Sequence, residues 1–223
     1  MIVTEQKAPA KIIDSLKEFQ RIFLVGCGEC ATTCKTGGEE ELAAIKKLLE
    51  QQGKTVVASC IPSAPCVASQ IKTELAKNMQ ALRQAEAILV LACGLGVQSV
   101  KDNDRLSHPV IPALNTMFGA VLDAAGNFYE KCSICGDCVL DITDGICPIT
   151  LCPKGILNGP CGGMDKGKCE VDKDKDCAWV LIYKELDQKK KLKQLKEIKK
   201  PKDFKKATRP HRLILSEQAQ LEK

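Results

Sequence analysis

Cysteine is the residue type in this chain with the clearest capacity for chemistry: there are 14 cysteines and only two histidines among 223 residues. In an oxidising compartment these cysteines would form disulfides, whereas in a reducing one they would serve metal or redox sites. The first 19 residues lack the apolar segment of a secretory signal, which predicts a cytoplasmic protein with free thiols. No apolar run approaches the roughly 20 residues of a membrane-spanning helix. The cysteines therefore predict bound metal, with disulfides as the less favoured alternative.

The strongest metal signal lies between residues 131 and 177. Its opening, KCSICGDC, has the C-x2-C-x2-C spacing at the start of a bacterial ferredoxin motif. In that motif the fourth cysteine follows three residues later and precedes a proline. Here Cys147 follows after eight residues and precedes Pro148, and Cys152 also precedes a proline, so the spacing leaves the fourth ligand open. The predicted metal ligands of this block are Cys132, Cys135, Cys138, Cys147, Cys152, Cys161, Cys169 and Cys177.

The same block contains many glycines and few large apolar residues, for example in the segment NGPCGG. Such a region cannot bury enough apolar surface to fold alone, so we expect bound metal to supply much of its stability. Eight thiolates are enough for two [4Fe–4S] clusters, or for one cluster and one zinc ion.

A second group of thiols lies in the segment GCGECATTC, where Cys27, Cys30 and Cys34 have C-x2-C-x3-C spacing. We expect Cys93, in ACGLG, to complete a [4Fe–4S] site with these three. A structural zinc site, a thioredoxin-like C-x-x-C pair and inert buried thiols are the alternatives. Cys60 and Cys66 stay ambiguous, since an ordinary buried thiol explains each of them at least as well as a metal ligand does.

The elements that must bring these thiols together are those of a small α/β fold. The apolar patterns predict strands at 21–26, 54–59, 87–92 and 110–114, helices at 39–52 and 70–85, and a short helix around Phe118, Val121 and Leu122. Alternating strands and helices are typical of a three-layer, flavodoxin-like or Rossmann-like parallel sheet. The first group of thiols follows the strands directly, so we expect it at the carboxyl edge of that sheet.

Charge and composition divide the chain into three parts: an α/β domain at 1–128, a cysteine-rich region at 129–183 and a basic tail at 184–223. The tail has 14 Lys and Arg against six Asp and Glu. Its stretch KKKLKQLKEIKK has apolar residues at helical spacing of three until Pro201, which predicts a basic helix. A nucleic-acid arm is one interpretation, but with aromatic residues at only 4% we favour a solvated helix or an arm on a partner subunit.

Fingerprints for nucleotide cofactors are absent from the sequence: it has neither G-x-G-x-x-G nor G-x-x-x-x-G-K-[ST]. It also offers no nucleophile–base arrangement, so we expect no catalytic residues and no nicotinamide or ATP site. This pattern favours a chain that carries metal and works beside a catalytic partner.

The stretch CSICGDCVLDITDGICPITLCPKGILNGPCGG, followed by GKCEV and DCAWVLIYKEL, resembles the C-terminal domain family of methylenetetrahydrofolate reductases. The resemblance extends from the GCGECATTC loop through Tyr183, and the lysine-rich tail lies outside it. Within this family it is similar to the MetV-type iron–sulfur subunits of acetogenic bacteria.

The resemblance implies a non-catalytic iron–sulfur subunit that passes electrons to the flavin of a MetF-type catalytic subunit. That partner, which would hold FMN or FAD, makes methyltetrahydrofolate in the Wood–Ljungdahl pathway. The implied cofactors of this chain are two [4Fe–4S] clusters, with zinc as a further occupant of the late cysteines. The implied assembly is a cytoplasmic hetero-oligomer that receives electrons from ferredoxin or from a larger oxidoreductase complex. From the composition we also expect no nucleic-acid partner and no membrane span.

Overall fold

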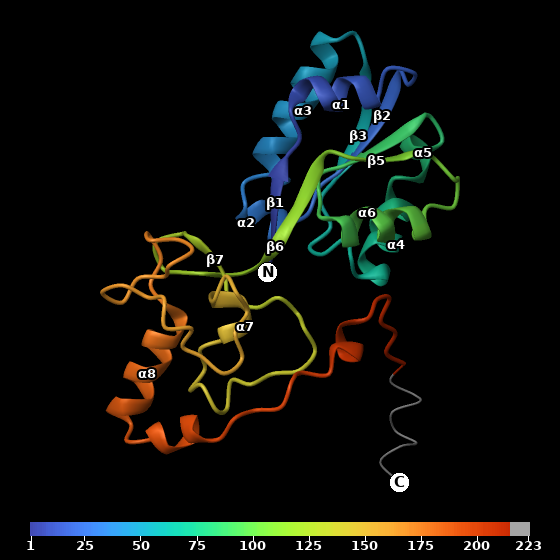
Figure 1. Cartoon of the computed structure of the whole chain (residues 1–223). Helices are drawn as coiled ribbons and strands as arrows, with labels where there is room; N and C mark the ends of the chain where they lie inside the picture. The colour runs from blue at the N-terminus through green and yellow to red at the C-terminus, as the bar shows by residue number, and fades with distance from the viewer. Residues whose placement is uncertain (215–223) are drawn as a thin grey trace. The chain divides into compact units, whose positions relative to one another are not determined.

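The computed structural model describes residues 1–214 and divides the chain into two compact units, Met1–Tyr129 and Glu130–Lys223 (Figure 1). Among the described residues, no helix has the length and apolar character needed to cross a membrane.

A four-stranded parallel sheet forms the centre of the first unit, in the order β3-β2-β4-β5. Its strands are β2 (Arg21–Val25), β3 (Thr55–Cys60), β4 (Ala87–Val90) and β5 (Val110–Pro112). Neighbouring strands pair in parallel, for example Leu24 with Leu89 and Val25 with Cys60. This confirms the α/β fold with a parallel sheet. The order reverses between β2 and β4, which is where ligands collect in doubly wound sheets.

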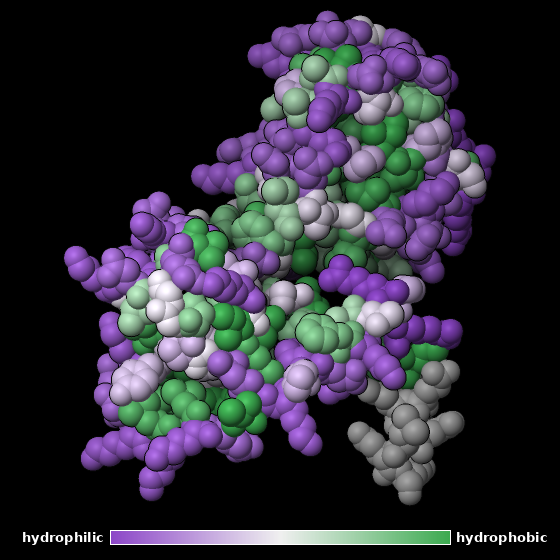
Figure 2. Space-filling view, viewed as in Figure 1, coloured by the Kyte–Doolittle hydropathy of each residue, from purple (hydrophilic) through white to green (hydrophobic). Residues whose placement is uncertain are grey.

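The helices of this unit are α1 (Pro9–Ser15), α2 (Cys30–Thr33), α3 (Glu39–Gln51), α4 (Ala68–Lys77), α5 (Met79–Leu82) and α6 (Gly94–Asn103). Figure 1 shows α1 and α3 on one face of the parallel sheet and α4, α5 and α6 on the other. On the face seen in Figure 2, hydrophilic side chains predominate over α1 and α3, whose apolar residues point inward. The predicted helix at 70–85 is divided at Asn78, which ends α4 and precedes α5; its backbone N–H and its side-chain amide both donate to the Glu74 carbonyl.

The apolar core lies between these layers and positions the strand ends. All four residues of β4 are fully buried, and Phe23, Leu49 and Ile71 are fully buried against them. The side chains of α3 and α4 reach this core at helical spacing, as an amphipathic helix requires. Because the core fixes the strands, it also fixes the loops at their carboxyl ends.

An antiparallel sheet was not expected from the sequence: it has the order β1-β6-β7, from β1 (Ile2–Gln6), β6 (Leu114–Leu122) and β7 (Phe128–Glu130). The predicted short helix around Phe118, Val121 and Leu122 is wrong, because all three residues lie in β6. Only Leu114 of β6 is buried, so its partly exposed apolar residues do not show the alternation of a half-buried strand. The pairing partner that makes it a strand, β1, lies more than a hundred residues earlier in the chain.

The second unit has little regular structure: α7 (Pro148–Leu151), α8 (Ala178–Gln188) and the 3₁₀ helices η1 (Leu192–Lys196) and η2 (Phe204–Ala207). Its apolar core consists of Cys177, Trp179, Ile182 and Leu186, with Leu192 and Leu195 packed against it. The predicted basic helix is not formed as one element. It is replaced by η1, which Lys190 separates from α8 with a backbone φ of 57°.

Candidate metal centres

All fourteen cysteines lie within the described residues, and all have free thiols. Across residues 1–214, no three Cys, His, Asp or Glu side chains lie close enough together to hold a metal ion as they stand. The structure therefore shows which thiols lie near one another, in three groups called neighbourhoods here, and metal binding stays a prediction.

The first neighbourhood lies at the carboxyl edge of the parallel sheet, as the sequence predicts for thiols that follow strands. Cys27 follows β2, and Cys93 follows β4 and caps the N-terminus of α6. Both thiols are buried. The loop after β2 is tied to the loop after β3 by a hydrogen bond from the Gly28 amide to the Pro62 carbonyl, 2.9 Å long. Two strand-end loops thus meet at one edge.

Cys66, which the sequence left ambiguous, belongs to this neighbourhood. Burial raises the pKa of its thiol, and so do the neighbouring thiols of Cys93, Cys27 and Cys30. Cys66 is therefore within electrostatic range of three of the four predicted ligands. In the sequence, the feature that could have grouped Cys66 with these thiols is its place in the loop that follows the predicted strand at 54–59.

Cys30 and Cys34 both meet the backbone of β1. The Ile2 amide donates to the sulfur of Cys30 at 3.4 Å, and the Cys34 thiol donates to the Ile2 carbonyl at 3.7 Å. The two sulfurs therefore flank one residue of the antiparallel sheet. The raised pKa of the Cys66 thiol has contributions from Cys27, Cys30 and Cys93. Cys34 is the fourth predicted ligand and is not among these contributors.

Cys60 is a core residue. Its side chain ends β3, and burial, followed by the charge of Glu74, raises the pKa of its thiol to about 12. A metal ligand must be a thiolate, and this environment opposes that form. The structure therefore favours the buried-thiol interpretation of Cys60.

The second neighbourhood is the loop CSICGDC at the start of the second unit. The Ile134 amide donates to the sulfur of Cys132 at 3.3 Å. Ile134 and Gly136 have φ values of 54° and 76°, so the backbone curls back around the cysteines. Backbone amides directed at ligand sulfurs are a feature of iron–sulfur loops, and this loop fits thiolate ligation of iron on that ground.

Thr150 connects Cys147 to this loop. Its hydroxyl accepts a hydrogen bond from the Ser133 amide at 3.0 Å and also meets the sulfur of Cys147 at 3.6 Å. Ser133 lies between Cys132 and Cys135, so the thiol of Cys147 lies beside the loop. Of the two cysteines that precede a proline, Cys147 rather than Cys152 is thus the one connected to the loop through Thr150.

Cys135 has a charged neighbour. The Lys202 ammonium donates to its sulfur at 3.1 Å, and this hydrogen bond is the main reason that the pKa of the Cys135 thiol is lowered. The environment thus favours the thiolate, which is the form that binds metal.

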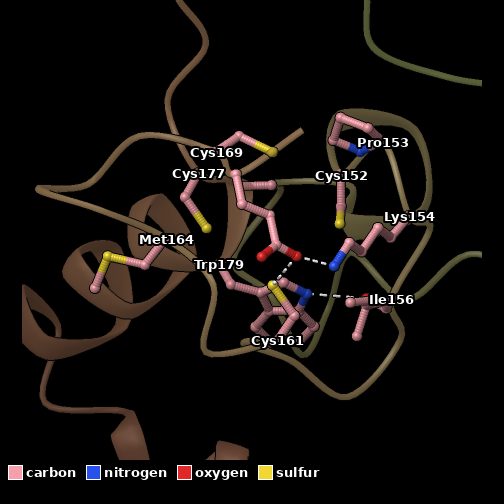
Figure 3. A pocket seen from close by; sticks show the side chains of 11 residues that line it. Cys152, Pro153, Lys154, Ile156, Cys161, Met164, Cys169, Cys177 and Trp179 are labelled. Atoms are coloured by element: carbon pink, nitrogen blue, oxygen red, sulfur yellow. Dashed lines mark hydrogen bonds and ion pairs between the residues drawn. The ribbon is translucent and has the colours of Figure 1, made fainter. Parts of the chain in front are cut away.

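The third neighbourhood is a small pocket whose lining includes Cys152, Cys161, Cys169 and Cys177. Figure 3 shows the sulfurs of Cys152, Cys161 and Cys177 turned toward a common space from separate segments of the chain. The cavity has a volume of about 10 Å³. This is room for roughly one water-sized body.

A carboxylate lies in this pocket. Glu170 accepts a hydrogen bond from the Cys161 thiol at 3.5 Å and forms an ion pair with Lys154. The Trp179 indole closes one side, where its N–H donates to the Ile156 carbonyl at 2.9 Å and its ring lies against Gly159. A Cβ at Gly159 would lie 2.4 Å from the indole, so only glycine permits this packing in the NGPCGG segment.

Comparison with known proteins gives a match for the later part of the chain. Residues 111–205 match a family model described as Methylene-tetrahydrofolate reductase C terminal. The match includes all eight late cysteines and extends into the lysine-rich tail, further than the resemblance in the sequence. It does not include the GCGECATTC loop. A search of curated proteins finds no match. Residues 111–205 are therefore similar to the methylene-tetrahydrofolate reductase C-terminal family, which confirms the resemblance over that range.

Proposed function

We propose that this chain is an iron–sulfur electron-transfer subunit of a methylenetetrahydrofolate reductase. The observation that carries the proposal is the loop CSICGDC with its neighbour Cys147. The loop presents a backbone amide to the Cys132 sulfur, places Cys135 beside a positive charge and reaches Cys147 through Thr150. These are the features by which a protein holds iron through sulfur and tunes it.

The first proposed cluster site uses Cys132, Cys135, Cys138 and Cys147. A [4Fe–4S] cluster bound there would supply one-electron transfer. The protein's own part is to hold the thiolates and to direct the Ile134 amide and the Lys202 ammonium at two of the sulfurs. Both contacts favour the more negative, reduced form of the site.

The second proposed cluster site lies at the sheet edge of the first unit. Cys27, Cys30 and Cys93 are three of its ligands, and the proximity of Cys66 supports this thiol as the fourth. Cys34, the fourth ligand predicted from the sequence, is the alternative.

The pocket of Cys152, Cys161, Cys169 and Cys177 is proposed as a zinc site. Its volume of about 10 Å³ supports a single ion there rather than a cluster. Four thiolates are a usual ligand set for structural zinc. Because the apolar core of this unit is small, zinc binding would stabilise its fold.

The proposed partner is a MetF-type catalytic subunit that holds FMN or FAD and the folate substrate. The family match supports this pairing, because it relates residues 111–205 to the C-terminal part of methylenetetrahydrofolate reductases. A flavin takes two electrons for each hydride, so one-electron carriers in series suit its supply. The proposed donor is ferredoxin or a larger oxidoreductase complex, and the proposed location is the cytoplasm.

One alternative has an observation of its own. In a zinc-stabilised scaffold that carries no electrons, the small pocket would be the functional metal site and the other thiols would be accessory. Such a chain would support the catalytic partner by contact alone.

Metal content decides between the two. The full chain is purified under strict anaerobiosis, its iron and zinc are measured, and the dithionite-reduced protein is examined by EPR. We expect about four irons for each of two clusters, one zinc, and reduced-cluster signals. A colourless protein that contains zinc and no iron would establish the scaffold and reject electron transfer.

A further inference from the structure

The lysine-rich tail contacts the cysteine loop of the proposed iron site. Lys202 donates to the Cys135 sulfur at 3.1 Å and also to the Asp137 carbonyl. Cys135 is the middle cysteine of the C-x2-C-x2-C run. Part of the tail that composition presents as a solvated arm therefore contacts the cysteine loop.

Neighbouring contacts hold Lys202 in place. Lys206 donates to the Asp137 carboxylate at 3.2 Å, which ties the tail to the residue next to Gly136. Asp203 accepts a hydrogen bond from the Lys205 amide at 3.0 Å and so fixes the start of η2. The tail between Lys202 and Lys206, here called the docked segment, is thus attached to the loop at more than one point.

Gly136 shows how close the docked segment comes. A Cβ at this position would lie 2.6 Å from the carbonyl oxygen of Lys206, and the backbone φ of 76° also favours glycine. A glycine is therefore required both by the curl of the loop and by the approach of the docked segment.

We infer that Lys202 sets the reduction potential of the cluster held by Cys132, Cys135, Cys138 and Cys147. The inference rests on the proposed function and goes beyond it by assigning a role to the tail. Reduction adds a negative charge to the cluster, and an ammonium group that donates to a ligand sulfur stabilises that charge. Lys202 therefore raises the potential, and its loss must make the cluster harder to reduce.

The test compares redox titrations, followed by EPR, of the anaerobic full chain and its variants. Lys202→Gln removes the charge, Lys202→Arg retains it, and Lys193→Gln removes an equal charge from η1 in the same tail. We expect Lys202→Gln to lower the equilibrium constant for one-electron reduction of one cluster about tenfold, which corresponds to a potential about 59 mV more negative. Lys202→Arg should retain most of the wild-type potential, and Lys193→Gln should retain all of it.

Several outcomes would overturn the inference. One is a Lys202→Gln protein with full iron and wild-type potentials; another is an equal shift in Lys193→Gln, which would indicate a general charge effect. If Lys202→Gln loses iron, Lys202→Met serves as the second variant, and loss of iron there too would make Lys202 a structural clamp and reject the tuning role. A wild-type chain without iron would reject the proposed function itself, and the inference with it.

Discussion

Contacts of individual residues determine which of the late cysteines lie near one another. The spacing of the cysteines identified the C-x2-C-x2-C run but left the next ligand open among Cys147, Cys152 and the later cysteines. The structure separates them through side chains that spacing does not report. Thr150 brings Cys147 to the loop, whereas Cys152 lines the small pocket. Such assignments depend on the path of an irregular chain, which no periodic pattern encodes.

Substitution of these two cysteines tests the assignment. In Cys147→Ser we expect iron to fall by about four per chain with zinc unchanged, because one cluster loses a ligand. In Cys152→Ser we expect zinc to be lost and iron to be unchanged. Both variants are purified anaerobically and their metals measured by mass spectrometry. Loss of iron in Cys152→Ser without loss in Cys147→Ser would reverse the assignment.

At the level of elements, buried structure was predictable and exposed structure was not. The strands of the parallel sheet form continuous apolar runs, so β2, β3 and β4 lie within a residue or two of their predicted bounds. In contrast, β6 is largely exposed and depends on pairing with β1. The helix α6 was also missed, because its sequence GLGVQSVKDN contains few apolar residues from which to detect periodicity.

Close contact between elements makes Gly37 the most sensitive glycine near the first thiol group. Its carbonyl accepts from the Cys27 amide at 3.0 Å, and a Cβ there would lie 2.1 Å from the Leu91 carbonyl oxygen at the end of β4. Gly37→Ala must displace this backbone contact, at a cost of about 1–3 kcal/mol.

Thermal unfolding of matched variants measures this cost. Gly37→Ala should unfold at a lower temperature than the wild type. Gly94→Ala is the control, since a Cβ there meets its nearest neighbour, the Thr116 hydroxyl, at an ordinary 3.4 Å. Equal melting temperatures for the two variants would show that the backbone near Gly37 yields without cost.

The whole molecule combines two units that are stabilised in different ways. The first has an extensive buried core between a sheet and its helices, whereas the buried apolar cluster of the second consists of Cys177, Trp179, Ile182 and Leu186. Composition predicted this contrast, because residues 131–177 are rich in cysteine and glycine and poor in large apolar residues. What composition could not predict is that lysines of the tail contact the cysteine loop, since their interaction spans more than sixty residues of sequence.

Removal of metal should therefore affect the two units unequally. After chelation we expect proteolysis to digest the second unit and to leave a fragment that ends near Tyr129, because that fragment retains its apolar core. Mass spectrometry of the digest identifies the fragment, and the metal-loaded chain under the same protease is the control. Digestion of both units at one rate would show that their stabilities are coupled.

The contacts of Ile2 have a practical consequence for handling the protein. β1 forms one edge of its sheet, and the Ile2 amide and carbonyl on that edge are occupied by the sulfurs of Cys30 and Cys34. Air oxidation of these sulfurs would alter both contacts at this strand edge, and exposed strand edges are surfaces on which chains join one another and aggregate. Exclusion of oxygen during storage thus protects solubility as well as any bound metal.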